Sequence, residues 1–217
     1  IEKYTGSLKA RNFEVFRERL DEKGLLPLAH DYFEASGALA VQCYKEEMES
    51  IFRSQSLGGF QVLDIQDFSG QGTALVGVLD AFMDEKGICT PEEWREFCND
   101  AVILAEFADY NLESGEEFAA EIRLTNYRPS GVCGKKFTAV LTCECGTELA
   151  RLSGEVPKTA ENYIALGRLA AQVPELEAPK KLTLALAVED TDIRNHYTLM
   201  AYPKRESVDT AGAYMFE

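Results

Sequence analysis

The feature that most constrains the fold of this chain is the alternation of apolar and polar residues that begins near residue 101. In an extended chain Phe118, Ala120, Ile122 and Leu124 all point to one face. The same period recurs at 137–143 and 182–188, and four further segments have suitable composition: 101–110, 148–156, 162–170 and 195–202. About seven short strands separated by turn residues are typical of an immunoglobulin-like β-sandwich. The sequence therefore predicts an all-β sandwich over 101–203.

Helical periodicity dominates the first 98 residues instead. Apolar residues at helical spacing predict amphipathic helices over 7–23 and 27–53, with Gly24 just past the end of the first. Thr90-Pro91-Glu92-Glu93 has the residues of a helix start, because threonine caps, proline suits the first position and glutamate reaches back. A domain boundary is expected at 98–101.

One short stretch, "GGFQVLDIQDFSGQGTALVGVLD" at 58–80, suggests where a ligand would bind. Phe60 to Ile65 has the composition of a buried strand, and the glycine-rich loop around and after its end contains Asp64, Asp67 and Gln71. Two helices followed by a strand and a polar loop are typical of α/β folds. In barrels of this class, binding groups project from the carboxyl ends of the strands.

These patterns together predict an α/β segment followed by a sandwich. We expect 1–98 to be the C-terminal part of a TIM barrel and 101–203 an all-β immunoglobulin-like sandwich. Residues 204–217 have charge but little periodicity, which predicts a linker or the start of a missing domain. A barrel segment without its neighbouring strands exposes apolar surface. We therefore expect this half to pack against the sandwich, to self-associate as a homo-oligomer, or to be poorly ordered.

Charge and cysteine usage argue against several classes of function. The formal net charge is −15, which disfavours nucleic acid and anionic membrane as partners. Among six cysteines only Cys143 and Cys145 are close in sequence, and no CxxC pair or histidine cluster accompanies them. On a strand both would share one face, so we expect buried or half-buried thiols, no metal site and no cofactor. Free cysteines favour a reducing compartment and a cytoplasmic location.

The chain also resembles a known enzyme family. The stretches "KYTGSLKARNFEVFRERL" (3–20), "ASGALAVQCYKEEMES" (35–50), the glycine-rich stretch extended to residue 87, and "NHYTLMAYP" (195–203) resemble the end of the catalytic barrel and the following sandwich of glycoside hydrolase family 2, the β-galactosidase and β-glucuronidase group. The resemblance implies that 60–65 is the eighth barrel strand and that the loop after it lines a sugar pocket. It also implies a carbohydrate substrate for the parent enzyme, but not which sugar, since aspartates stand where many relatives carry tryptophan.

The same resemblance implies that this chain is a fragment without its catalytic residues. The family's nucleophile and acid/base glutamates lie before the first helix, and no residue here matches them. Retaining glycosidases need two carboxyl groups about 5 Å apart, so the fragment alone is expected to be inactive. Asp64, Asp67 and Gln71 are then expected to hydrogen-bond sugar hydroxyls. Their other interpretation is loop capping, which Asp, Ser and Gly serve very often.

A second function competes with the glycosidase fragment. The sandwich could be a stand-alone module that binds carbohydrate or protein. Such modules use exposed aromatic platforms, and Tyr127, Tyr163, Tyr197 and Tyr202 are available, although they fall among residues with the core pattern. The lone tryptophan, Trp94, is expected to anchor the two domains rather than to stack on sugar, because large aromatic side chains supply buried area.

Overall fold

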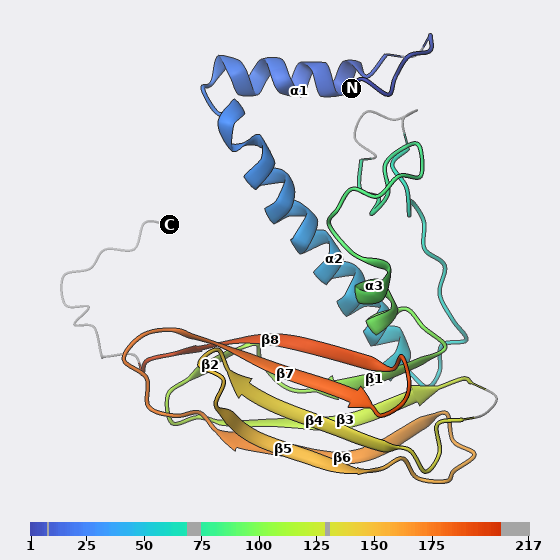
Figure 1. The fold of residues 1–217 in the computed structure, drawn as a ribbon, viewed down its shortest axis with the longest axis vertical. Coiled ribbons are helices and arrows are strands. Elements are labelled where there is room, and N and C mark those ends of the chain that lie inside the picture. Colours follow the sequence, from blue (N-terminus) through green and yellow to red (C-terminus); the bar gives the residue numbers. More distant parts are fainter. Residues whose placement is uncertain (8, 69–74, 129–130, 205–217) are drawn as a thin grey trace, which may run out of the picture. The chain divides into compact units, whose positions relative to one another are not determined.

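The computed structural model describes residues 1–7, 9–68, 75–128 and 131–204. The chain divides into two compact units, Ile1–Cys98 and Asn99–Glu217. The second unit is a two-layer β-sandwich, and the first is built from helices and long loops (Figure 1).

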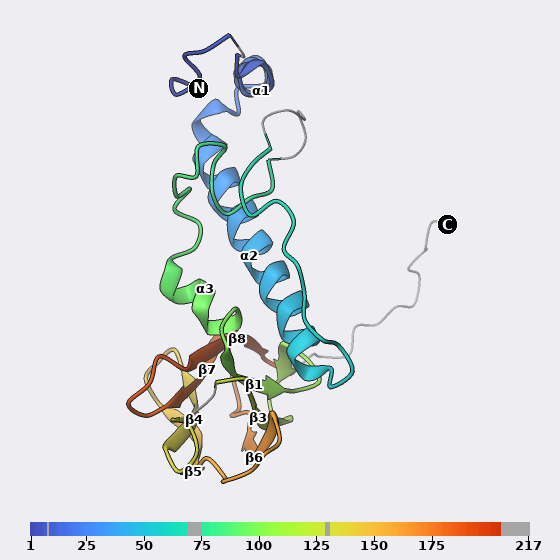
Figure 2. The same cartoon turned by 90° about the vertical axis from the view of Figure 1, so that its right-hand side faces the viewer.

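Two sheets form the sandwich. The three-stranded sheet has the order β1-β3-β6, and its strands are β1 (Ala101–Glu106), β3 (Glu117–Asn126) and β6 (Tyr163–Gln172). The five-stranded sheet has the order β2-β8-β7-β4-β5, and its strands are β2 (Asn111–Glu113), β8 (Arg194–Tyr202), β7 (Lys180–Val188), β4 (Lys136–Cys143) and β5 (Glu148–Glu155). Figure 2 shows β7, β4 and β5 in one layer and β1, β3 and β6 in the other. The sandwich predicted from the alternation is therefore present.

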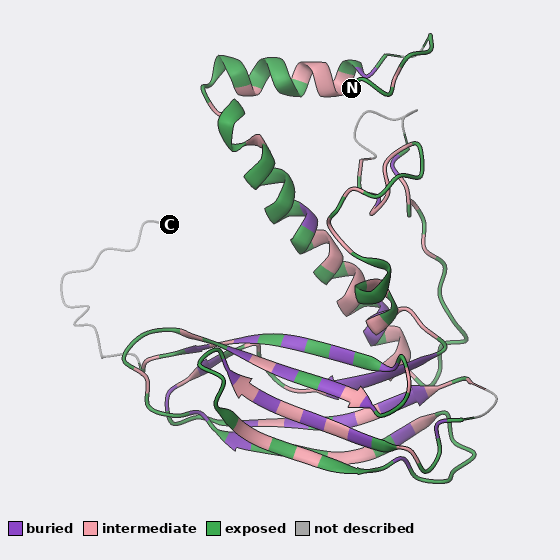
Figure 3. Ribbon diagram, viewed as in Figure 1, coloured by how far each residue is buried: buried purple, intermediate pink, exposed green. Residues whose placement is uncertain are grey.

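The core of the sandwich lies between the two sheets. Buried residues alternate with more exposed ones along β3, β4, β7 and β8, as the banding in Figure 3 shows. The inward side chains with no exposed surface include Ile103, Ile122, Leu124, Leu141, Leu182, Leu184 and Leu199. Each such side chain contributes roughly 1.5–3 kcal/mol when it leaves water, so the alternation read from the sequence is also the main source of stability.

The first strand is shorter than the sequence predicts. The stretch 101–110 was expected to be one strand, but β1 ends at Glu106 and the chain then crosses to β2 in the other sheet. The Asp109 carboxylate accepts a hydrogen bond from the Asn111 amide at 2.8 Å, which turns the backbone locally. Phe107 packs on Tyr197 and Phe118, so the crossing segment still covers the core.

Side chains from β8 cover backbone groups of β1, which is an edge strand of the three-stranded sheet. Asn195 donates from Nδ2 to the carbonyl of Ile103 at 2.8 Å, and the Tyr197 hydroxyl accepts from the amide of Ala105 at 3.1 Å. Asn195 and Tyr197 are both 2% exposed and also hydrogen-bond each other at 3.2 Å. An edge strand whose polar groups are satisfied in this way is a poor template for another chain.

The pairing of β2 with β8 differs from all other strand pairs in the described residues, because it is parallel. Asn111, Leu112 and Glu113 lie opposite residues 200–202. Backbone hydrogen bonds extend the ladder at both ends, from the Met200 amide to the Tyr110 carbonyl at 2.8 Å and from the Ser114 amide to the Tyr202 carbonyl at 2.9 Å. The segment after β1 is thus held along the last strand of the sandwich.

Helices α1 (Arg11–Glu22), α2 (Ala29–Arg53) and α3 (Pro91–Phe97) belong to the first unit, with a short 3₁₀ helix η1 (Leu26–Leu28) before α2. The two predicted amphipathic helices are present, and Gly24 adopts the left-handed conformation expected after a helix end. The helix start predicted at Thr90 is confirmed. Its hydroxyl accepts from the Glu93 amide at 3.2 Å, and the Glu93 carboxylate accepts from the Thr90 amide at 2.7 Å.

Replacing Thr90 with alanine is expected to destabilise α3 by about 1 kcal/mol, because one amide at the helix start loses its acceptor. Trp94 lies on α3 and is the only tryptophan, so its fluorescence during urea unfolding measures the effect. Thr90→Ser should keep most of the stability because it retains the hydroxyl. Equal destabilisation by serine and alanine would contradict the capping role.

The predicted TIM-barrel segment is wrong. Residues 60–65 form no strand in the structure. Among the residues that the structure describes, the bridges near them are isolated ones between Gln66 and Leu79 and between Leu79 and Glu85. Phe60 and Ile65 are about 40% exposed and Leu63 is 78% exposed, so the segment is not a buried barrel strand. Helices α1, α2 and α3 thus accompany a looped segment rather than a parallel sheet.

Residues 60–65 do not form a strand for two reasons, which are the backbone conformation of Asp64 and the lack of a partner strand. Asp64 has a φ of 61°, a left-handed conformation that interrupts an extended strand. A parallel strand also needs neighbours on both sides, and the described part of this unit supplies none as a ladder. Apolar composition alone cannot distinguish a buried strand from a loop whose apolar side chains are left exposed. Self-association through this surface stays a prediction.

Candidate functional site

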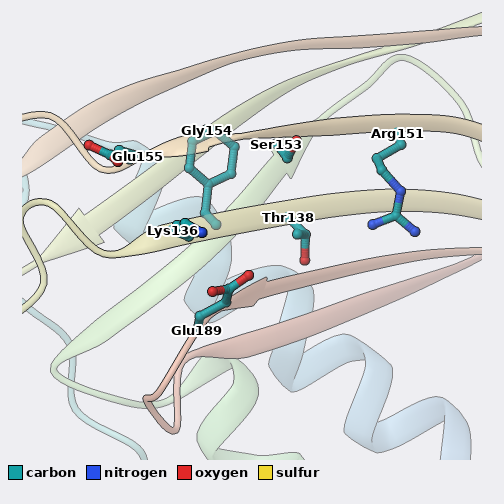
Figure 4. Close-up of a pocket in the computed structure, with 8 residues that line it drawn as sticks. Lys136, Thr138, Arg151, Ser153, Gly154, Glu155 and Glu189 are labelled. Carbon is teal, nitrogen blue, oxygen red and sulfur yellow. The ribbon is translucent and has the colours of Figure 1, made fainter.

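A polar hollow of about 470 Å³ lies on the five-stranded sheet (Figure 4). Strands β4 and β5 supply most of its walls, and Glu189, which follows β7, completes it. The residues that line it are Lys136, Phe137, Thr138, Arg151, Ser153, Gly154, Glu155 and Glu189. Its size falls within the about 300–1,000 Å³ of typical small-molecule sites.

The antiparallel register of β4 and β5 explains why polar side chains gather there. Lys136 lies opposite Glu155, Thr138 opposite Ser153, and Val140 opposite Arg151. Positions two apart share a face, so these residues all point away from the core. The hairpin therefore brings two cations, two hydroxyls and a carboxylate together on one face of the sheet.

Gly154 makes room for the residue beneath the hollow. It lies opposite Phe137, which is 2% exposed, and a Cβ at position 154 would meet the phenyl ring at 2.9 Å. That separation is shorter than real Cβ contacts, so any larger residue would push the ring from its place. Because position 154 is glycine, the Phe137 ring can pack in the core directly beneath the hollow.

Hydrogen bonds hold the turn that contains Glu189. The Glu189 amide donates to the Lys136 carbonyl at 2.8 Å, and the Thr191 hydroxyl donates to the Val188 carbonyl at 2.7 Å. Arg128 binds the same turn through Asp192, with nitrogen–oxygen distances of 2.6 and 2.9 Å. This hydrogen bond holds the pKa of Asp192 well below its usual range, so the ion pair is present at neutral pH.

The charges around the hollow are balanced. Lys136 and Arg151 are cationic, and Glu155 and Glu189 are anionic. Arg151 also donates to Glu148 at 2.9 and 2.5 Å, and this interaction lowers the pKa of the Glu148 carboxyl. A ligand in the hollow would therefore meet both hydrogen-bond donors and hydrogen-bond acceptors, and the electrostatic potential there would not be strongly positive or negative.

The residues expected from the sequence to bind sugar lie in the first unit. Asp64 and Asp67 both lie near the phenol of Tyr44 on α2. The pKa of Tyr44 is raised, first by burial and then by the negative charges of Asp64, Glu47 and Asp67. The third residue, Gln71, lies outside the residues that the structure describes.

The Asp67 carboxylate already has partners within the chain. It is 4% exposed, accepts from Lys86 Nζ at 2.6 Å and accepts from the Gly77 amide at 3.1 Å. Lys86 in turn donates to the Gly77 carbonyl at 2.8 Å. These bonds tie the segment around Asp67 to the returning segment 75–79. Sugar binding by Asp64, Asp67 and Gln71 stays a prediction, and what the structure shows for Asp67 is a loop-fixing ion pair.

The tyrosines considered as stacking platforms differ in exposure. Tyr197 is buried, whereas Tyr127 is 56% and Tyr202 is 39% exposed. Tyr163 is half-buried, and its hydroxyl donates to Glu106 on the three-stranded sheet. None of the four lines the hollow.

Sequence reasoning missed the hollow because its residues look like ordinary surface positions of two strands. The signal that existed was the repeated polar residue on the outward positions of both strands around one hairpin, with a glycine in the second. Among described residues, no group of three or more metal-ligating side chains is present, and no helix is long and apolar enough to cross a membrane.

One family model matches part of the sandwich. Residues 116–203, from the start of β3 to the end of β8, match the model of a family described as a domain of unknown function (DUF8488). No curated protein is similar enough to the sequence to count as a relative.

Solved structures that resemble part of the chain are remote. A CARDB domain from Pyrococcus furiosus, solved in complex with di-metal ions, has 11% identity and a TM-score of 0.33, and the match covers 48% of this chain and 88% of that one. A β-glucuronidase from Parabacteroides merdae has 12% identity and a TM-score of 0.32, covering 48% and 14%. A glycosyl hydrolase family 2 member from Bacteroides cellulosilyticus has 12% identity and a TM-score of 0.30, covering 44% and 14%.

At these scores the likenesses carry no argument about activity, and they do not show the glycosidase family that the sequence resembles. This chain spans 14% of the length of either glycosidase. The β-sandwich stands on its own strand order and core.

Proposed function

We propose that the sandwich is a non-catalytic binding module whose ligand is a carbohydrate, held in the hollow between β4, β5 and Glu189. The observation that carries the proposal is the set of hydroxyl, cationic and carboxylate side chains that one hairpin and one fixed turn direct into a single hollow. A binding role for the sandwich is favoured over the glycosidase fragment because this polar set lies on the sandwich itself.

The chemistry of the hollow suits a neutral, hydroxyl-rich ligand. Lys136 and Arg151 supply donors, Glu155 and Glu189 supply acceptors, and the Ser153 hydroxyl supplies both. A sugar hydroxyl also donates and accepts, so every group in the hollow has a match. An anion would meet repulsion from the two carboxylates, and a cation would meet repulsion from the ammonium and guanidinium groups.

Binding rather than catalysis is expected from the residue types. Within the described lining, neither hydroxyl has a histidine that could act as its base. The rigid strand positions favour recognition, because side chains on strands hold their geometry better than side chains on loops. We therefore expect no turnover of nitrophenyl glycosides by this chain.

The test is a screen of the full chain against an oligosaccharide array, followed by NMR titration of the sugar that binds. Amide shifts should change in β4, in β5 and at Glu189. Arg151→Gln is expected to weaken binding at least about tenfold, since a hydrogen bond to a charged group contributes roughly 1.5–3 kcal/mol. Arg168→Gln, an exposed arginine on the three-stranded sheet that pairs with Glu117, is the matched control and should bind normally.

Three outcomes would contradict the proposal. One is an array on which no sugar binds, and another is binding that Arg151→Gln leaves unchanged. The third is a set of shifts confined to 64–86, which would favour the Asp64 and Asp67 loop instead. Turnover of a nitrophenyl glycoside would contradict the non-catalytic role.

A further inference from the structure

The turn between β4 and β5 contains two cysteines in an unusual setting. Cys143 is the last residue of β4, and Cys145 lies in the turn that follows. The Gly146 amide donates to the Cys143 carbonyl at 2.8 Å, and the Cys143 amide donates to the Thr147 carbonyl at 2.9 Å. Gly146 has a φ of 84°, which a glycine adopts without strain and which closes this tight turn. The two cysteines were expected to share one strand face, but the turn places Cys145 outside the strand.

The turn brings the two thiols together while exposing only one. Cys143 is 8% exposed, Cys145 is exposed, and both are free. The Cys143 thiol is near enough to Cys145 to contribute to the lowered pKa of the Cys145 thiol, after Thr147. Cα atoms two residues apart can be separated by no more than about 7 Å, and a turn shortens that distance into the roughly 4.4–6.8 Å that a disulfide requires. A bond between these sulfurs therefore needs side-chain rotation rather than a new fold.

The surroundings of Cys145 favour its thiolate. Its sulfur lies 3.2 Å from the Thr147 hydroxyl. Hydrogen bonds from that hydroxyl, then from the Thr147 backbone and from the Cys143 thiol, lower the pKa of Cys145 to about 7. The Lys180 ammonium pairs with Glu144 at 3.1 Å and is close enough to both sulfurs for their charges to contribute to its own raised pKa, after Glu144. Exposed cysteines whose thiolate is stabilised by neighbouring groups are the reactive ones in proteins.

We propose that Cys143 and Cys145 form a redox-active dithiol that exchanges with low-molecular-weight disulfides, with Cys145 as the attacking thiol and Cys143 as the resolving thiol. This site is independent of the proposed sugar hollow. It rests on the turn geometry, on the contact of Cys145 with Thr147 and on the unequal exposure of the two sulfurs.

The reaction balances in two steps. The Cys145 thiolate attacks one sulfur of a disulfide R–S–S–R; its S–S bond breaks, a mixed disulfide forms on Cys145, and RS⁻ leaves and takes up a proton. Cys143 then loses its proton and attacks Cys145 Sγ; the mixed disulfide breaks, the Cys143–Cys145 bond forms, and the second RS⁻ leaves as RSH. The protein dithiol is oxidised by two electrons and the small disulfide is reduced to two thiols.

The test treats the full chain with glutathione disulfide and maps the products by mass spectrometry. The native chain should lose two hydrogens on the peptide that contains both cysteines. Cys143→Ser should instead trap one glutathionyl group on Cys145, because the resolving thiol is gone. Cys145→Ser should leave this peptide unmodified. Cys43 and Cys133 are also exposed but have no neighbouring cysteine in the sequence, so they are internal controls and should react more slowly.

A second arm measures how fast iodoacetamide alkylates Cys145 at different pH values. The thiolate is the reactive form and is populated above the pKa, so the rate should rise with pH, reach half its maximum near pH 7 and then level off. Thr147→Val removes the hydroxyl and should move the midpoint to higher pH, whereas Thr147→Ser should move it little.

Several results would contradict the proposal that Cys143 and Cys145 form a redox-active dithiol. One is glutathionylation spread equally over Cys43, Cys133 and Cys145. Another is a stable mixed disulfide on the native chain with no internal bond. Because Cys143 is buried and serine could unfold the turn, Cys143→Ala provides a second resolving-thiol variant; failure of both variants, when folded, to trap the mixed disulfide would refute the assigned roles.

Discussion

Replacing Leu184 with alanine is expected to lower the free energy of unfolding of the sandwich by about 3–5 kcal/mol. Leu184 lies on β7, inside the five-stranded sheet, opposite Leu141 on β4 and Tyr197 on β8. Its side chain has no exposed surface. Truncation removes buried apolar atoms and leaves a cavity that neighbours on both sides hold open. A loss of this size is a large share of the about 5–15 kcal/mol that stabilises a typical domain.

Hydrogen exchange of the strand amides under increasing urea measures the Leu184→Ala effect, and it separates the sandwich from the other unit. Thr198→Ala is the matched control, because Thr198 lies on the neighbouring strand but is exposed. Its substitution should cost less than about 1 kcal/mol, the range of strand propensities. If both variants lost a similar free energy of unfolding, the side of the five-stranded sheet that carries Leu184 would not be the side that packs in the core.

The second large effect is expected from Lys86→Met, which should destabilise the loop around Asp67 by roughly 3 kcal/mol. The substitution leaves a nearly buried carboxylate without its cation, and it also removes the donor to the Gly77 carbonyl. Trp94 reports the change through Tyr44, whose ring packs against it and whose hydroxyl donates to the Val76 carbonyl at 3.3 Å.

Asp67→Asn combined with Lys86→Met should recover much of that loss, because no unpaired charge then remains. Lys3→Met is the control; Lys3 pairs with Asp80 and Asp84 on the surface, and its loss should change the Trp94 transition little. Full stability of Lys86→Met would leave Asp67 free for the sugar-binding role predicted from the sequence.

The sandwich could be predicted because the apolar residues that alternate in its sequence are the same residues whose burial stabilises it. Each alternation of the type Phe118, Ala120, Ile122 marks one buried face, and a slip of one residue would expose the whole set. The helix start at Thr90 was equally readable, since its hydrogen bonds are local and need no knowledge of the rest of the fold. Local and periodic signals therefore predicted these elements well.

The structure of segment 60–65 in the first unit could not be predicted, for the opposite reason. A strand at 60–65 depends on partners elsewhere, and a six-residue apolar run does not say whether those partners exist. The hollow was invisible for a related reason: Thr138 and Ser153 become neighbours only through the register of β4 and β5. Cys145 was expected on a strand face because residues two apart on a strand share a face, whereas the turn that closes at Gly146 carries its thiol off the strand.

The parallel ladder between β2 and β8 has a mechanical consequence. β2 lies early in the sandwich and β8 last, so a pull on the two ends of this unit draws the two strands in opposite directions along their common axis. Hydrogen bonds across a parallel pair then carry the load in shear and must break together rather than one after another. The chain from Tyr110 to Ser114 would thus act as a clamp on residues 200–202. Forced unfolding, which is governed by the unfolding rate, should show one high-force event that a proline at Leu112 abolishes.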